Sequence, residues 1–175
     1  MIMIYLVRQG QTDWNLFKRC NGVTETFLNQ TGIEQSKLQA ENLKDVRFDV
    51  CFCSPQKRTH QTCKIIYKEP IVFDGRLIEI ICGEFEGKEE TTEMMKQFWQ
   101  AAANGDKGTE KVDDFMKRNF DFCDMIKAEH KGKNILIVTH AANVRAITYY
   151  FLGMPKDYNF NKAPIKSGEL ITFEN

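Results

Sequence analysis

Residues 3–10 of the chain read MIYLVRQG, and this stretch decides the fold. A short, fully apolar run that ends at a polar turn with glycine is typical of a strand buried on both faces of a parallel sheet. Residues 135–139, which are followed by His140, show the same pattern of an apolar run that ends at polar residues. Ligands bind beyond the carboxyl ends of the strands in open α/β sheets, so we expect Arg8, Gln9 and His140 to meet in one site.

Strands alternate with helices along the rest of the chain. Apolar runs and helical periodicity predict strands over residues 49–53, 71–73 and 170–173, and helices over residues 32–43, 56–67, 94–102, 112–126 and 143–152. This alternation favours an α/β fold, with a mostly parallel sheet and helices on both of its faces. No repeat, low-complexity stretch or linker divides the sequence, so we expect a single domain over residues 1–175.

Composition and charge argue against several classes of protein. The chain has 175 residues, of which 24 are Lys or Arg and 24 are Asp or Glu, so its formal net charge is zero. Proteins that bind nucleic acid or an anionic membrane normally carry a basic excess, and we expect neither partner here. No apolar run is long enough to span a bilayer. We therefore expect a cytoplasmic protein that is a monomer or a homodimer.

The six cysteines do not form a metal-binding pattern. None belongs to a C-x-x-C pair, and their spacing differs from that of zinc ligands. Cys51 and Cys53 alternate within an apolar run, so their side chains share one face of the predicted strand. We expect buried, reduced thiols and no metal at all six positions, which are Cys20, Cys51, Cys53, Cys63, Cys82 and Cys123.

Five motifs follow one another along the chain at characteristic spacing. They are residues 6–15 (LVRQGQTDWN), 28–35 (LNQTGIEQ), 54–62 (SPQKRTHQT), 77–87 (LIEIICGEFEG) and 139–141 (THA). Together they resemble the histidine phosphatase superfamily, whose first motif is L-V-R-H-G-x-T-x-W-N and whose fold is the phosphoglycerate mutase-like fold. The resemblance covers nearly the whole chain, with residues 88–108 the least informative. Residues 77–87 are more similar to the phosphatase branch than to the mutases.

Gln9 departs from the family pattern at a decisive point. The family uses the histidine of R-H-G as the nucleophile that accepts the phosphoryl group. An imidazole nitrogen has a free lone pair, whereas the nitrogen of a glutamine amide is delocalised into its carbonyl and is a poor nucleophile. The amide can still donate a hydrogen bond to phosphate, so we expect binding to survive where turnover is impaired.

The resemblance implies a phosphate-binding set around this position. Arg8 and Arg58 supply planar, permanently charged groups that match phosphate oxygens. Asn15 offers an amide donor to the same oxygens, and the backbone amide of Ala141 follows His140. His140 is expected to donate to the phosphoryl group and to stabilise the charge that develops there.

Three further residues complete the site by resemblance. Glu79 takes the position of the family's proton donor, which protonates the leaving oxygen and needs a pKa raised towards neutrality. Asn21 and Gly22 fall where family members line the substrate pocket. The arginines provide the positive charge, so the resemblance implies neither a metal nor a cofactor.

These residues lead to three functional hypotheses. In the first, the protein is a phosphomonoesterase that acts on a small phosphorylated metabolite. It is impaired because Gln9, either a natural change or a substitution introduced to trap a ligand, replaces the nucleophile. In the second, it is a non-catalytic pseudophosphatase that holds phosphate or a phosphoester. In the third, His140 takes over as nucleophile or Glu79 drives direct attack by water. Loss of a covalent nucleophile costs orders of magnitude in rate, so we expect residual activity at most.

Overall fold

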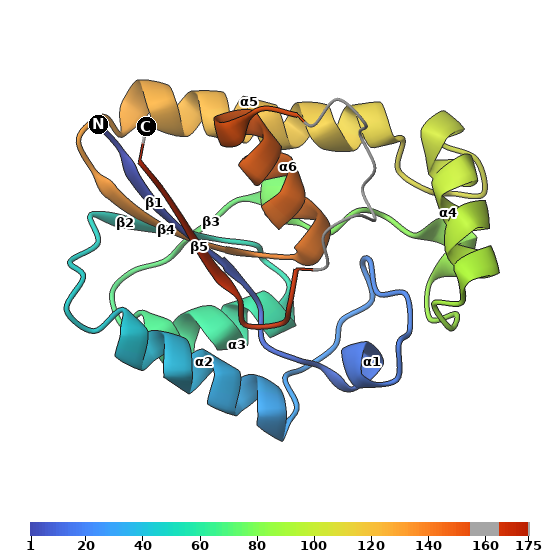
Figure 1. Cartoon of the computed structure of the whole chain (residues 1–175), viewed down its shortest axis with the longest axis horizontal. Helices are drawn as coiled ribbons and strands as arrows, with labels where there is room; N and C mark the ends of the chain where they lie inside the picture. The colour runs from blue at the N-terminus through green and yellow to red at the C-terminus, as the bar shows by residue number, and fades with distance from the viewer. Residues whose placement is uncertain (155–164, 175) are drawn as a thin grey trace.

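A five-stranded sheet forms the centre of the molecule (Figure 1). The computed structural model describes residues 1–154 and 165–174. In sheet order the strands are β3 (Val72–Phe73), β2 (Val50–Cys53), β4 (Asn134–Thr139), β1 (Met3–Arg8) and β5 (Leu170–Glu174). The first four are parallel, and β5 pairs antiparallel with β1. The mostly parallel α/β fold that the sequence predicts is therefore confirmed.

Helices cover both faces of this sheet. α2 (Gln30–Asn42) and α3 (Lys57–Ile66) pack against each other on one face. α5 (Val112–Glu129) and α6 (Ala141–Leu152) pack against each other on the opposite face, as Figure 1 shows. α3 and α6 both begin just past the carboxyl end of a strand, β2 and β4 respectively.

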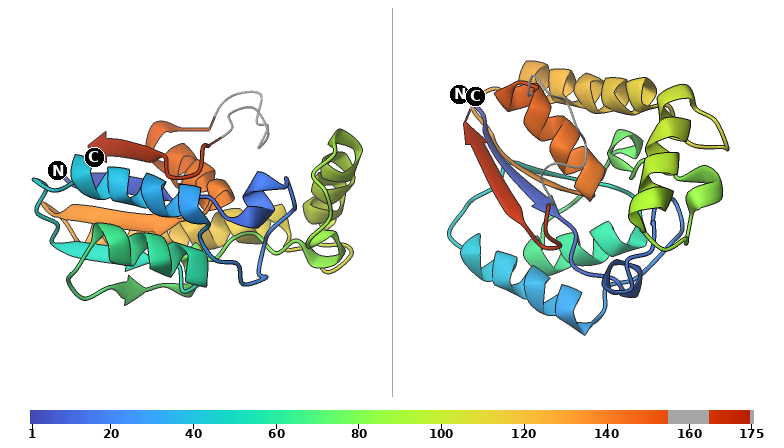
Figure 2. Two further views of the ribbon diagram at one scale, coloured as in Figure 1. Left: turned by 90° about the horizontal axis from the view of Figure 1, so that it is seen from below. Right: turned by 45° about the vertical axis from the view of Figure 1, so that its right-hand side comes forward.

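Two elements lie beyond the carboxyl ends of the strands. One is the short helix α1 (Asp13–Leu16), and the other is α4 (Thr92–Asn104), which stands away from the sheet in both views of Figure 2. Two short 3₁₀ turns, η1 (Gly75–Leu77) and η2 (Gly83–Phe85), lie on the path from β3 to α4. This path carries the chain past the end of the sheet at which the sequence predicts a site.

Apolar side chains fill both interfaces between the sheet and the helices. On one face, Ile4 of β1 packs in a cluster with Phe122 of α5. On the other, Cys51 and Cys53 pack with Cys63 of α3, which confirms that the first two share a face. Full burial of one large aliphatic or aromatic side chain contributes about 1.5–3 kcal/mol. The central strands are buried on both faces, which explains why their sequences are continuous apolar runs.

Helix ends differ from the predicted ones for local reasons. α4 begins early because the Thr91 side chain accepts a hydrogen bond from the backbone at its N-terminus, and it ends at Gly105, whose φ of 78° is left-handed. α6 begins two residues before the predicted start, with His140 as an N-cap in extended conformation whose side chain makes no capping bond. α1 was not predicted at all, since four residues are too few for periodicity; Thr12 and Asn15 hold it through a capping box.

The described residues show neither a membrane-spanning helix nor a metal-binding cluster. Within residues 1–154 and 165–174, none of the helices combines the length and the apolar character needed to cross a bilayer. The same two stretches contain no group of three or more His, Cys, Asp or Glu side chains placed to hold a metal ion. The six cysteines are buried free thiols.

Candidate active site

The strand order brings the predicted site residues together. β4 lies between β1 and β2, and Arg8 at the end of β1 is in register with Thr139 at the end of β4. The backbone N–H of Gln9 donates to the carbonyl oxygen of Thr139 at 2.9 Å. Arg8, Gln9 and His140 therefore leave the sheet side by side, as the two strand ends predict.

Gly10 allows the chain to turn tightly after these residues. A Cβ atom on Gly10 would lie 2.3 Å from the carbonyl oxygen of Gly32 in α2, which is far inside contact distance. The Gly10 N–H donates to the hydroxyl of Thr62 in α3 at 3.0 Å. The missing side chain thus lets both helices close over the end of β1 and hold Gln9 in place.

Gln9 is buried, with 3% of its surface exposed. Its backbone is fixed on both sides, because its carbonyl also accepts the N–H of Gly168 at 3.0 Å. The side-chain oxygen is buried and has no hydrogen-bond partner in the part of the chain that the structure describes. Rotation of the amide places its nitrogen at the same point, so the end of this side chain offers either a donor or an acceptor that no described group uses.

The two arginines differ in how much of their hydrogen-bonding capacity the protein uses. Arg8 donates through Nη1 to the carbonyl of Ile165, while its Nε atom is buried and none of the described residues partners it. Arg58, at the start of α3, is 1% exposed and donates to the carbonyl oxygens of Gly22 at 2.8 Å and Thr24 at 3.1 Å. Burial lowers the pKa of both guanidinium groups, and the carboxylate of Glu79 opposes this effect. Arginine remains charged at neutral pH in such surroundings.

Glu79 is held close to both arginines and is buried. One carboxylate oxygen accepts the backbone N–H of Ile80 at 2.9 Å, and the other lies 3.5 Å from the N–H of Ala142. Burial raises the pKa of Glu79, and the nearby backbone donors and arginines offset this only in part. A carboxyl group in this state holds its proton more tightly than usual and can act as an acid.

His140 is completely buried at the N-cap of α6. Its Nε2 atom lies 2.9 Å from the hydroxyl oxygen of Ser54, whereas its Nδ1 atom is buried without a partner. Burial and the positive charges of Arg58 and Arg8 lower the pKa of His140 well below its usual value. The imidazole is therefore neutral at pH 7. Ala141, the next residue, is half-buried in the first turn of α6.

Asn15, which is also predicted to donate a hydrogen bond to phosphate, has a structural role in the capping box of α1 as well. Its side-chain oxygen accepts hydrogen bonds from the N–H and the hydroxyl of Thr12, both at 3.0 Å. These bonds orient the amide and leave its NH₂ end without a hydrogen bond to any described residue. The donor that the resemblance assigns to Asn15 is thus present, on a side chain fixed by the capping box.

The loop that carries Asn21 and Gly22 is tied to the site by residues to which the sequence analysis gives no role. The carboxylate of Glu86 accepts the N–H groups of Gly22 at 2.9 Å and Thr24 at 3.0 Å. Gln56 donates from its amide to the carbonyl of Gly22 at 2.9 Å and accepts the N–H of Glu79. Gln56, Glu86 and Ser54 lie inside the quoted motifs, so their positions were visible but their contacts were not.

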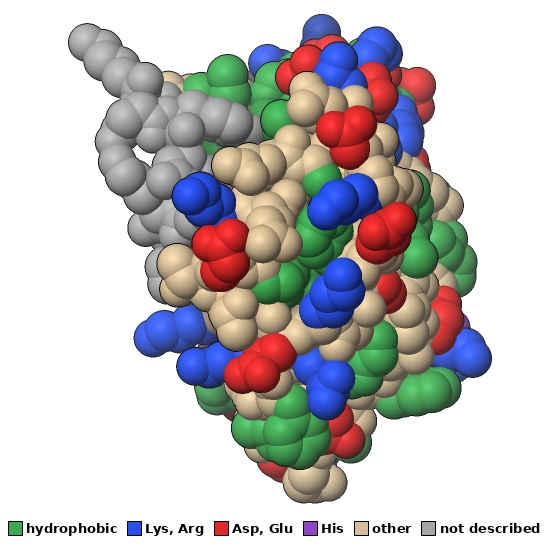
Figure 3. Space-filling view, turned by 90° about the vertical axis from the view of Figure 1, so that its right-hand side faces the viewer, with side chains coloured by type: hydrophobic (Ala, Val, Ile, Leu, Met, Phe, Trp, Pro, Cys, Tyr) green, Lys and Arg blue, Asp and Glu red, His purple; other side chains and the backbone are tan. Residues whose placement is uncertain are grey.

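A small cavity of about 100 Å³ opens beside Glu79. The walls include Asn21, Arg145 and Ala141, and α4 contributes Trp99, which also packs against an apolar cluster. The side-chain oxygen of Asn21 is buried and unpartnered, while its NH₂ group donates to the hydroxyl of Thr26 at 2.8 Å. Figure 3 looks onto the end of the molecule at which α1 and α4 lie, where acidic, basic and hydrophobic side chains are interspersed.

Unpartnered buried polar atoms concentrate in this region. Within the part of the chain that the structure describes, six buried side-chain nitrogen or oxygen atoms have no hydrogen-bond partner. Four of the six belong to predicted site residues, namely Arg8, Gln9, Asn21 and His140. Each such atom costs about 1–3 kcal/mol if nothing binds it, so their concentration indicates a place for a polar ligand.

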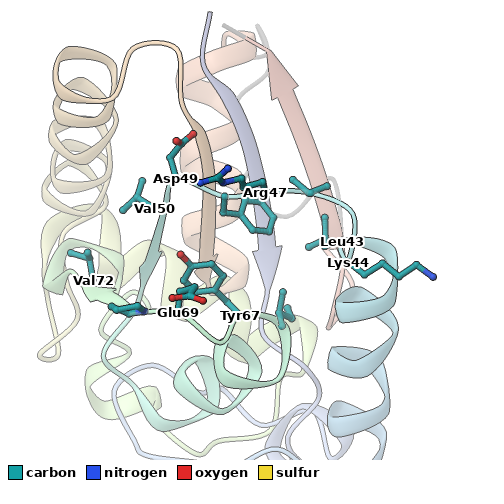
Figure 4. Close-up of a pocket in the computed structure, with 12 residues that line it drawn as sticks. Leu43, Lys44, Arg47, Asp49, Val50, Tyr67, Glu69 and Val72 are labelled. Atoms are coloured by element: carbon teal, nitrogen blue, oxygen red, sulfur yellow. The ribbon is translucent and has the colours of Figure 1, made fainter.

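A second, larger cavity lies at the opposite end of the sheet (Figure 4). Its volume is about 700 Å³, and it opens where β2 begins, among Arg47, Asp49, Tyr67 and Glu69. None of the residues around it carries a buried polar atom without a partner among those described. It also contains none of the residues that the sequence motifs single out, so we do not assign the site there.

Comparisons with known proteins agree with the fold and with the motifs. Residues 4–174 match the sequence model described as histidine phosphatase superfamily (branch 1). The uncharacterized phosphatase PhoE of Bacillus subtilis (strain 168) is 32% identical over 152 residues, which are 84% of this chain and 76% of that protein. A probable 2-carboxy-D-arabinitol-1-phosphatase of Arabidopsis thaliana is 33% identical over 89% of this chain, but the chain spans only 34% of that protein's length.

Solved structures extend the comparison to three dimensions. A phosphoserine phosphatase mutant from Entamoeba histolytica, solved in complex with phosphoserine, has a TM-score of 0.85 to this chain. The two are 24% identical, and the match covers 99% of this chain and 91% of the other. At that level of identity the likeness shows a common fold.

Proposed function

The chain belongs to the histidine phosphatase superfamily, and we propose that its site binds the phosphoryl group of a small phosphorylated metabolite and hydrolyses the ester slowly or not at all. In this proposal Arg8, Arg58 and His140 hold the phosphoryl oxygens. Gln9 occupies the nucleophile position without replacing its chemistry.

One observation carries the proposal: buried donors without partners surround the end of β1. Arg8 Nε and His140 Nδ1 are both inside the fold, and neither has a hydrogen-bond partner within residues 1–154 and 165–174. Arg58 donates two of its five N–H groups to loop carbonyls. The other three have no hydrogen bond to a described residue. A tetrahedral oxyanion supplies several acceptors at once and carries the charge that balances the two guanidinium groups.

Gln9 explains why turnover is expected to be poor. A covalent phosphoryl intermediate needs a nitrogen with an available lone pair, and an amide nitrogen has none. Glu79, by contrast, keeps the raised pKa that a proton donor to the leaving oxygen needs. The site thus retains binding and acid groups but lacks a nucleophile. The alternative, a pseudophosphatase with no turnover at all, is supported by the same unpartnered donors, because they need only a bound anion.

The size of the cavity beside Glu79 is an argument for a substrate with a small leaving group. Its volume of about 100 Å³ is close to three times the roughly 30 Å³ share of one liquid water molecule. Zero net charge supports a small-molecule partner over nucleic acid or an anionic membrane. We further propose that the protein acts in the cytoplasm, as a monomer or homodimer, with no metal or cofactor, since the arginines supply the positive charge.

The test compares the protein with its Gln9→His variant. Inorganic phosphate is titrated into each by calorimetry, and hydrolysis of p-nitrophenyl phosphate is measured alongside. Gln30→His, on the exposed start of α2, is the matched control, because it adds the same side chain at a surface position whose amide bonds to Glu34 and not to the donors. We expect phosphate binding by all three proteins and a gain of at least about a thousandfold in hydrolysis for Gln9→His only.

Each outcome separates the alternatives. Rapid hydrolysis by Gln9→His, with a phosphoryl group trapped on the introduced histidine, supports an impaired phosphomonoesterase. Phosphate binding with no hydrolysis by either protein favours the pseudophosphatase. If the unsubstituted protein fails to bind phosphate, the proposal is wrong.

A further inference from the structure

We propose that Ser54 is a positioning residue, which fixes the proton of His140 on Nδ1 so that this buried N–H donates to the bound phosphoryl group. The inference rests on the proposed function for the identity of the ligand. It concerns a residue that makes no contact with the ligand itself and acts only through the imidazole.

The contact between the two side chains follows from the sheet. Ser54 comes directly after β2 and His140 directly after β4, and these strands are hydrogen-bonded neighbours. The backbone N–H of Ser54 donates to the carbonyl of Val138 at 3.0 Å, which anchors the residue against β4. Both side chains are completely buried, and the Ser54 hydroxyl oxygen lies 2.9 Å from His140 Nε2. Water therefore does not compete for this bond.

The single proton of the Ser54 hydroxyl decides which histidine nitrogen is protonated. The acceptor within hydrogen-bond distance of this hydroxyl is His140 Nε2, and the backbone N–H of Gln56 approaches the hydroxyl oxygen at 3.5 Å from another side. If Nε2 carried the proton, two donors would point at Ser54 and its own proton would have no acceptor among the described residues. A buried hydroxyl proton without an acceptor destabilises this tautomer. With Nε2 as acceptor, the Ser54 hydroxyl and Nε2 satisfy each other, and only Nδ1 is left to find a partner.

This arrangement moves the proton of the neutral ring to Nδ1. Arg58 and Arg8 disfavour a second proton on the ring, and burial has the same effect. Nδ1 is buried and has no partner among the described residues, so its N–H is a donor that none of them accepts. Nε of Arg8, at the end of the adjacent strand, is in the same state. An oxyanion bound beyond the carboxyl ends of β1 and β4 would satisfy both.

Nitrogen-15 NMR of the imidazole rings tests the assignment directly, because protonated and unprotonated ring nitrogens have different shifts. The chain has only three histidines, so the His140 signals can be assigned with single substitutions of His60 and His130. We expect the unsubstituted protein to show His140 with Nδ1 protonated and Nε2 unprotonated. The opposite pattern would overturn the inference, and this result needs no variant of Ser54 to fold.

Three variants then measure what the contact does. Ser54→Ala should give a mixture of the two His140 tautomers and weaken inorganic phosphate binding about tenfold, the effect of one hydrogen bond to a charged ligand. Ser54→Thr keeps the hydroxyl and should restore both. Thr59→Val is the matched control: its hydroxyl donates to backbone carbonyls of the same turn, at Ser54 and Gln56, and does not contact His140. It should lower thermal stability while leaving tautomer and affinity unchanged.

The NMR measurement and the phosphate titration can contradict the inference and the proposed function independently. If Ser54→Ala retains the tautomer and affinity of the unsubstituted protein, Ser54 does not position His140. If the unsubstituted protein shows Nδ1 protonated but does not bind phosphate, the tautomer stands and the proposed function is wrong. The NMR pattern thus decides the inference, and the phosphate titration decides the ligand.

Discussion

The two ends of the sheet are built from the same strands but differ in how their polar groups are satisfied. At the amino end a cavity of about 700 Å³ is bordered by Asp49, which accepts a backbone N–H of β4 at 2.8 Å and lies near Lys133 in solvent. At the carboxyl end the cavity beside Glu79 is about 100 Å³, yet Arg8, Gln9, Asn21 and His140 each bury a polar atom without a partner. The difference teaches that unmet hydrogen-bonding capacity in a buried place, and not volume, marks where this protein binds a ligand.

Arg58→Ala should have the largest effect on this comparison. It removes a buried guanidinium that also holds the carbonyls of Gly22 and Thr24, so we expect inorganic phosphate affinity to fall by about a hundredfold or more. Arg47→Ala, at the amino-end cavity, is the matched control and should leave the affinity unchanged. Titration calorimetry measures both.

Arg58→Lys keeps the charge but loses the planar fork, and its affinity should lie between those of the protein and Arg58→Ala. Comparison of the two variants separates the loss of phosphate contacts from the loss of the hydrogen bonds that hold the loop at Gly22 and Thr24. Unchanged phosphate affinity in Arg58→Ala would contradict the assignment of the site to the carboxyl end.

Gly10→Ala should show how tightly the carboxyl end is packed. The added methyl group meets the carbonyl oxygen of Gly32 at 2.3 Å, and backbone cannot move aside easily, so we expect a loss of about 3 kcal/mol in the free energy of unfolding. Gly75→Ala is the control, because nothing lies within 4 Å of its Cβ position, and should change stability by less than about 0.5 kcal/mol. Urea unfolding compares them; equal stability of the two variants would show that the turn after β1 is loosely packed.

Much of this end of the molecule could be predicted from the sequence. The apolar runs before Arg8 and His140 predict two buried strands, and parallel strands place their carboxyl ends together. That reasoning needs no side-chain contact, which is why it succeeds. The antiparallel direction of β5 is a different case, because five residues of mixed burial at a sheet edge carry no signal for strand direction.

The contacts between loops could not be predicted in the same way. The bonds from Arg58 to Gly22, from Glu86 to the same loop and from Ser54 to His140 join residues 36, 64 and 86 positions apart. Periodicity reports only local structure, and a motif gives the position of a residue without its partner. Trp99 shows the same limit: helical spacing indicates an apolar face, but only the packing of α4 decides that this face borders the cavity beside Glu79.

The pH dependence of stability should have opposite signs at the two ends. Burial raises the pKa of Glu79, so the folded protein binds that proton more tightly, and this contribution to stability is lost as pH rises above about 4.5. A backbone hydrogen bond from Asn134 lowers the pKa of Asp49, so its contribution is present above about pH 3.8 and is lost as pH falls below it. Each carboxylate is thus the control for the other.

Thermal unfolding of Glu79→Gln and Asp49→Asn between pH 3 and pH 8 checks these signs. Relative to the unsubstituted protein, Glu79→Gln should gain stability as pH rises, and Asp49→Asn should lose it. The same direction of change in both variants would mean that burial does not distinguish the two carboxylates, and the contrast between the two ends would fail.

Lys133→Ala should have the smallest effect. The Lys133 Nζ atom is 3.4 Å from the Asp49 carboxylate, and the two side chains are 50% and 42% exposed, so solvent and salt screen their attraction. We expect the midpoint of thermal unfolding to fall by no more than about 1–2 °C, as for a weak surface pair in a chain of this size, and the difference to disappear at high salt. Lys131→Ala, a nearby exposed lysine outside this pair, is the matched control. A larger fall that persists in salt would mean that the amino end depends on its charges as strongly as the carboxyl end does, and unmet hydrogen-bonding capacity would then no longer separate the two.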